Sequence, residues 1–82
     1  MLNVEQLEHL RRVETTPNRV GTAMALTGVT QIELAAAIGL TQGYVSRIKN
    51  GQYGPELPGE TMRAFAEFFG CAIEDLFPKA AA

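Results

Sequence analysis

The chain has 82 residues and a formal net charge of -2, and 46% of its residues are hydrophobic and 20% charged. This balance is typical of one folded domain and excludes a disordered chain, and no run approaches the length of about eighteen consecutive apolar residues that spans a membrane. One cysteine and one histidine exclude a disulfide framework and the usual structural zinc sites. We therefore expect a soluble, cytoplasmic protein with no metal or other cofactor, and no enzymatic activity, because no catalytic motif surrounds Cys71 or His9.

Residues 1–16 are predicted to form an amino-terminal extension with one amphipathic helix between Leu2 and Val13. Its apolar residues recur at every third position: Val4, Leu7, Leu10 and Val13. This spacing places them on one side of a helix. Arg11 and Arg12 are then expected on the solvated side.

The domain itself is predicted to cover residues 17–78, and its first helix to begin at Pro17 with Thr16 as the N-cap. Proline suits the first helical position because the backbone N–H that it lacks would have no partner there. This helix extends to Leu26 or Thr27, and Gly28 ends it in the left-handed conformation.

Two short helices follow, and each is opened by a threonine. Thr30 is the predicted N-cap of the first helix, and Glu33, three residues later, completes a capping box. Gly39 ends this helix. Thr41 caps the second helix, which reaches Asn50.

The stretch from Gly51 to Gly59 is predicted to be a loop, because glycine and proline are frequent in it. The helix after it ends at Gly70 and carries an apolar stripe: Met62, Phe65, Ala66 and Phe69. Ile73 to Phe77 make one last turn, and residues 79–82 are a frayed tail. The predicted fold class is therefore all-α, a compact bundle of about five short helices with an extra amino-terminal helix.

The bundle is predicted to contain a helix-turn-helix from Gln31 to Asn50. A left-handed turn at Gly39 would set its two helices at a steep angle and leave the second one exposed. At about 100° per residue, part of that second helix points inward: Thr41, Tyr44, Val45 and Ile48. Other residues point outward or reach outward from the first turn: Gln42, Gly43, Ser46, Arg47 and Asn50. Their guanidinium, amide and hydroxyl groups can bond base edges or phosphates.

Basic residues are concentrated in the middle of the chain, around this motif. Between Arg19 and Gly54 three cations stand against one anion, a local charge of +2. The remainder has four cations and eight anions, a charge of -4. A nucleic acid would therefore be met by the middle part, in spite of the negative total.

Three segments within this region resemble the lambda-repressor-like Cro/repressor helix-turn-helix family, and their spacing matches without a gap: Thr30–Ala35, Ile38–Gln42 and Val45–Gly51. The small Ala35 and the turn Gly39 fall where that family has them, as do the apolar positions Leu34, Ile38, Leu40, Val45 and Ile48. A looser resemblance extends from Val20 through Phe77.

The resemblance implies that the second helix of the motif enters the major groove of double-stranded DNA. The residue at Gln31 commonly bonds a backbone phosphate in this family, and Asn50 matches a position that often touches the backbone. Three positions face the bases: Gln42, Ser46 and Arg47. By its own chemistry a glutamine such as Gln42 can pair with adenine, and an arginine such as Arg47 with guanine.

Other residues of the motif have more than one interpretation. Lys49, on the flank of the second helix, is predicted to contact a phosphate. Tyr44 either packs its ring or offers its hydroxyl to a phosphate. Gln31 is either a plain helix-start residue or the phosphate contact that the family implies. Gly43, which has no side chain, admits close approach of the DNA or a water.

The function expected from this motif is sequence-specific regulation of transcription, with repression favoured, at a palindromic operator bound by a homodimer. Two short recognition helices are needed because one reads too few base pairs. The dimer contact is expected near Leu76 and Phe77 of the final turn or on the amino-terminal helix.

An alternative is an antitoxin or adaptor whose residues 1–16 bind another protein. This idea loses its basis if Leu7, Leu10 and Val13 only cover the domain's own core. The same extension has a further interpretation as an arm through which Arg11 and Arg12 reach DNA.

Overall fold

Six α-helices and no strand make up residues 1–13 and 17–78, the part of the chain that the computed structural model describes. In chain order the helices are α1 (Val4–Arg12), α2 (Val20–Thr27), α3 (Gln31–Ile38), α4 (Gln42–Lys49), α5 (Gly59–Phe69) and α6 (Ile73–Leu76). The predicted all-α bundle with an extra amino-terminal helix is confirmed. Within the described ranges no single helix is long and apolar enough to cross a membrane. The pair α2 and α3 would pass that test by length and composition only, and it is bent by 110°.

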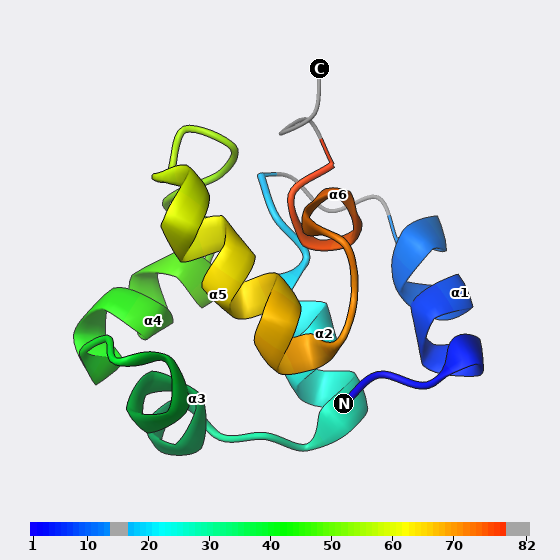
Figure 1. Cartoon of the computed structure of the whole chain (residues 1–82), viewed down its shortest axis with the longest axis horizontal. Helices are drawn as coiled ribbons and strands as arrows, with labels where there is room; N and C mark the ends of the chain where they lie inside the picture. The colour runs from blue at the N-terminus through cyan, green and yellow to red at the C-terminus, as the bar shows by residue number, and fades with distance from the viewer. Residues whose placement is uncertain (14–16, 79–82) are drawn as a thin grey trace.

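Helix α5 lies at the centre of the molecule, with α3 and α4 on one side of it and α1 on the other (Figure 1). Phe65 and Phe69 of α5 are fully buried, and the Phe65 ring packs edge-on against the ring of Phe77, with 6.3 Å between the ring centroids. Aromatic side chains bury large apolar areas, and edge-to-face pairs add to that gain. The apolar stripe predicted for this helix is therefore the centre of the core.

Helix α3 begins and ends where the sequence predicts. The Thr30 hydroxyl oxygen accepts a hydrogen bond from the Glu33 N–H at 3.1 Å, and the Glu33 carboxylate accepts one from the Thr30 N–H at 2.9 Å. These bonds lower the pKa of Glu33, because they favour the charged carboxylate. The capping box is confirmed, and with it the start of the first helix of the motif.

The start of α2 differs from the prediction: the helix begins at Val20, and Pro17 lies before it in irregular structure. The reason is Asn18, a buried residue whose side-chain oxygen accepts from the Val20 N–H at 2.9 Å. Its amide nitrogen donates to the backbone oxygens of Ile48 and Tyr53, at 2.9 and 2.7 Å. These partners hold residue 18 outside the helix. The predicted cap Thr16 and the tail at 79–82 lie outside the described residues.

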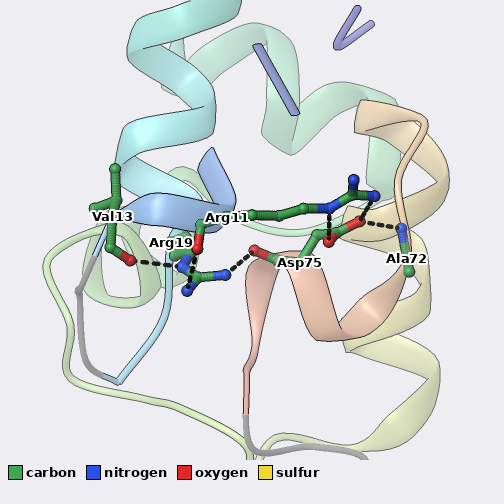
Figure 2. A network of polar contacts seen from close by, with 5 residues as sticks. All are labelled: Arg11, Val13, Arg19, Ala72 and Asp75. Carbon is green, nitrogen blue, oxygen red and sulfur yellow. Dashed lines mark hydrogen bonds and ion pairs between the residues drawn. The ribbon is translucent and has the colours of Figure 1, made fainter. Parts of the chain in front are cut away.

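Helix α1 is joined to the domain by backbone and side-chain hydrogen bonds from both of its ends. The Leu2 N–H donates to the Phe69 oxygen at 2.8 Å, and the Gln6 side chain donates to the Leu26 oxygen at 2.8 Å. At the other end, Arg11 donates through Nε to the Asp75 carboxylate at 2.8 Å (Figure 2). Arg11 lies on the solvated side of α1, as predicted, with 56% of its side chain exposed, but its ion pair with Asp75 was not predicted, because this partner lies on a distant segment.

Asp75 connects three parts of the chain. Its carboxylate also accepts from the Ala72 N–H at 3.0 Å and so caps α6, where Ala72 has no capping group of its own. The hydrogen bond from Arg11 is the main cause that lowers the pKa of Asp75. Next to it, Arg19 donates to the backbone oxygens of Val13, Arg11 and Asp75, as Figure 2 shows.

Several apolar side chains that were expected to contact a second protein are packed inside the domain instead. Leu76 and Phe77 are fully buried within one copy of the chain, so these two side chains are not available to a second copy, and a dimer contact near them stays a prediction. Leu10 is fully buried and Leu7 packs against the same core. Leu7 and Leu10 therefore cover the domain's own core, which weakens the alternative function, whereas Val4, also predicted on the apolar side of this helix, is 72% exposed.

Candidate nucleic-acid interface

The turn between α3 and α4 is built on Gly39, which has φ 74° and ψ 29°. Its N–H and that of Leu40 both donate to the Ala35 oxygen, which closes the end of α3. A β-carbon added to Gly39 would meet nothing within 4 Å. The need for glycine is therefore one of backbone conformation rather than of space, because other residues adopt this positive φ at a cost.

The inner side of α4 is fixed by apolar packing. Val45 and Ile48 are fully buried, and Ala35 of α3 is 4% exposed where the two helices pack together. Tyr44 is half-buried, and its ring packs edge-on against Tyr53, with 5.6 Å between the ring centroids. The predicted inward positions Tyr44, Val45 and Ile48 are thus confirmed, and the Tyr44 ring packs as one of its two interpretations required. Thr41, predicted inward as well, is exposed, because as the N-cap it precedes the helix and its hydroxyl accepts from the Tyr44 N–H.

The outer side of α4 carries the residues predicted to read bases. Gln42, Gly43 and Arg47 are exposed, and Ser46 is half-buried. A β-carbon added to Gly43 would lie 3.8 Å from the Arg47 Nη1 atom, so the guanidinium lies back over the first turn of the helix. The two longest side chains predicted to read bases, those of Gln42 and Arg47, therefore lie at the same end of α4.

The electrostatics of α4 favour an anion along its outer side. The helix contains no acidic residue, and Arg47 and Lys49 occupy its last turn. Cations in a last turn also interact favourably with the carboxyl end of the helix dipole. Asn50, at the C-cap, is exposed beside them.

Two of the residues predicted to contact phosphate meet each other across the motif. Lys49 Nζ donates to Gln31 Oε1 at 3.1 Å, which joins the end of α4 to the start of α3. Both residues, together with Gln42, line an open hollow of about 520 Å³ between α2, α3 and α4. Tyr44 and Asn50 do not line this hollow.

Some residues that position this surface were missed from the sequence. Asn18 bonds the carbonyl at the end of α4, as described above, but its partners lie far along the chain and no local pattern reveals them. Gly21 could have been identified from the sequence, since a glycine inside a predicted helix often marks a place where another segment packs closely. A β-carbon there would lie 3.2 Å from the Lys49 oxygen.

No three His, Cys, Asp or Glu side chains come together as a metal site would need, within residues 1–13 and 17–78. Cys71 is half-buried, and burial raises the pKa of its thiol to about 11. A neutral thiol is a poor nucleophile and a poor metal ligand.

Comparison with known proteins agrees with the position of this surface. A family model described as helix-turn-helix matches residues 23–76. The match includes the whole of α3 and α4 and leaves α1 outside it. No curated protein and no solved structure matches the chain.

Proposed function

The chain belongs to the lambda-repressor-like helix-turn-helix family of DNA-binding transcription regulators, and on that premise we propose that it is a sequence-specific repressor that binds a palindromic operator as a homodimer. The observation that supports this most is the division of α4. Its inner side is held by the buried Val45 and Ile48, while Gln42 and Arg47 are exposed on a helix without acidic residues. The proposal includes a cytoplasmic location and no catalytic step.

In this proposal α4 lies in the major groove and reads base edges. The Gln42 amide pairs with adenine and the Arg47 guanidinium with guanine, each through two hydrogen bonds. Ser46 is half-buried and its side chain is short, so its hydroxyl bonds a base edge that lies close to α4. Gly43 lets the DNA approach between them, because it adds no side chain to the surface.

The remaining residues of the surface bind the sugar-phosphate backbone and set the register of α4. Gln31 and Lys49 do so from the hollow beside α2, and Asn50 from the end of α4. Tyr44 contributes its hydroxyl while its ring packs against Tyr53. Such contacts supply affinity that depends on salt but not on sequence.

We propose that residues 17–78 are the DNA-binding domain and that the extension at 1–16 provides the dimer contact. Of the two expected dimer surfaces we choose α1, because the side chains of Leu76 and Phe77 in the final turn are fully buried. Met1 and Val4 are 80% and 72% exposed at its start. Two copies would place their α4 helices about 34 Å apart, one turn of DNA, and half-sites roughly ten base pairs apart.

Selection of binding sites from a random duplex library tests this function. The expected result is an enriched palindrome with half-sites one helical turn apart, bound by two copies of the chain. Selection that enriches no sequence would contradict specific binding. An enriched site without symmetry, bound by one copy, would contradict the homodimer.

A further inference from the structure

Lys49 does not extend freely into solvent but reaches back across the motif. Its backbone lies against α2, where a β-carbon on Gly21 would be 3.2 Å from the Lys49 oxygen and 3.6 Å from its Cγ. Its ammonium group then meets Gln31 Oε1 at 3.1 Å. Gly21 is thus the small residue that makes room for the stem of Lys49, and Gln31 is the residue that its charged end reaches.

The chemistry of this pair fixes which way the Gln31 amide faces. An ammonium group has three donors and no acceptor, so it can bond only the oxygen of the amide. The NH2 end of Gln31 is therefore turned away from Lys49 and is left for another partner. Without Lys49 the Gln31 amide could rotate and present either its oxygen or its NH2 group to the DNA, because water can bond both ends equally well.

We infer that Lys49 is a positioning residue of the DNA interface, which holds the Gln31 amide with its NH2 group toward a backbone phosphate. This inference rests on the DNA binding proposed above. The two residues act as one unit: Gln31 donates to the phosphate through its NH2 group, and Lys49, bonded to the oxygen of the same amide, supplies positive charge beside it.

The surroundings suit a segment of sugar-phosphate backbone. The polar residues that line the hollow are Thr30 and Gln31 at the start of α3 and Gln42 and Lys49 of α4, and these can meet the charged oxygens. Its opposite part is apolar and can pack against a deoxyribose: Met24, Ala25, Val29 and Ile32. Ile32 is 62% exposed, so its side chain is available for such a contact.

A double-mutant cycle on the selected operator tests the coupling. Gln31→Ala is expected to lower the affinity about tenfold when Lys49 is present and about threefold or less in the Lys49→Met background. Lys49→Arg keeps a group that only donates, so it is expected to restore the larger effect of Gln31→Ala. Gln31→Glu keeps an acceptor for Lys49 but has no NH2 group, and it is expected to bind DNA less well than Gln31→Ala.

The matched control is Arg63→Met, which removes the same charge from an exposed position of α5 that belongs to neither the motif nor the extension at 1–16. It is expected to leave the Gln31→Ala effect unchanged. Thermal unfolding of each variant checks that a loss of DNA affinity is not caused by a loss of folded protein. Equal effects of Gln31→Ala in the Lys49 and Lys49→Met backgrounds would overturn the inference while leaving the proposed function standing. No salt-dependent binding of any duplex by the unaltered protein would instead overturn the proposed function, and the inference with it.

Discussion

The α3–α4 motif and the junction of α1 with α6 are held together in opposite ways. The motif depends on contacts a few residues apart, such as the Thr30–Glu33 capping box, and on buried apolar side chains between its two helices. The junction depends on polar contacts between segments that are distant in the chain, such as Arg11 with Asp75. The motif therefore has an outer side that packing leaves unused, whereas the polar groups of the junction are occupied with one another.

This contrast separates two kinds of substitution. Changes on the outer side of α4 should alter DNA binding and spare stability, because those side chains are exposed. Changes at the junction should alter stability and spare base preference. Changes between α3 and α4 should do both, since they move the recognition helix.

Ala35→Leu is expected to have the largest effect on stability. Ala35 is 4% exposed against α4, and the added atoms have no space, so the free energy of unfolding should fall by about 1–3 kcal/mol. Chemical denaturation measures this loss, and operator binding should weaken in the same variant. Ala36→Leu, at an exposed position of the same helix, is the control. Equal stability of the two variants would show that α3 and α4 are not closely packed at Ala35.

Gly39→Val is expected to lower the free energy of unfolding by roughly 1–2 kcal/mol, through backbone strain alone. The φ of Gly39 is 74°, and a β-carbon there meets no neighbour. Gly39→Asn should therefore lose less than Gly39→Val, because asparagine tolerates this conformation better. Denaturation of both variants checks the order, and equal losses would mean that the turn does not keep a positive φ.

Acid should weaken the junction through Asp75. The pKa of this carboxyl is lowered below its ordinary value of 3.8, mainly by the hydrogen bond from Arg11, so its contribution is present above that value and is lost as pH falls through the lowered pKa. The unaltered protein should therefore lose more stability between pH 6 and strongly acidic solution than Asp75→Asn does, as followed by thermal unfolding. Parallel pH curves for the two proteins would contradict this account of the junction.

Gly21→Ala is expected to have the smallest effect on stability, under about 1 kcal/mol, since alanine favours helix while its β-carbon crowds Lys49. The same substitution should lower DNA affinity, because it displaces the stem of Lys49. Thermal unfolding and a DNA titration of one preparation measure both. Unchanged affinity would mean that the position of Lys49 does not matter for binding.

The same contrast decides what could be predicted from the sequence. The ends of α3 and the turn at Gly39 were predicted correctly, because their signals lie within three or four residues of each other. The predicted start of α2 was wrong, because Asn18 is held outside the helix by hydrogen bonds to backbone carbonyls 30 and 35 residues away. Local periodicity carries no information about partners at that distance.

The candidate surface follows the same division. The inward and outward sides of α4 were predictable, since 100° per residue places Val45 and Ile48 together and leaves Arg47 outside. The pairing of Lys49 with Gln31 was not, because it needs the angle between α3 and α4 and the close approach of α2 at Gly21. The roles of these residues on DNA stay predictions.

The central claim is that the outer side of α4 reads bases while its flank holds the backbone. Titration of Arg47→Ala and Lys49→Ala with fluorescent operator and scrambled duplexes, at several salt concentrations, tests it most directly. Arg47→Ala should cost about 1–3 kcal/mol on the operator and much less on the scrambled duplex, and Gln42→Ala should behave alike at an adjacent base pair. Lys49→Ala should weaken both duplexes equally and reduce the salt slope by about one. An equal loss on both duplexes for Arg47→Ala would contradict its role in base reading, and unchanged binding by all three variants would show that α4 is not the surface that reads DNA.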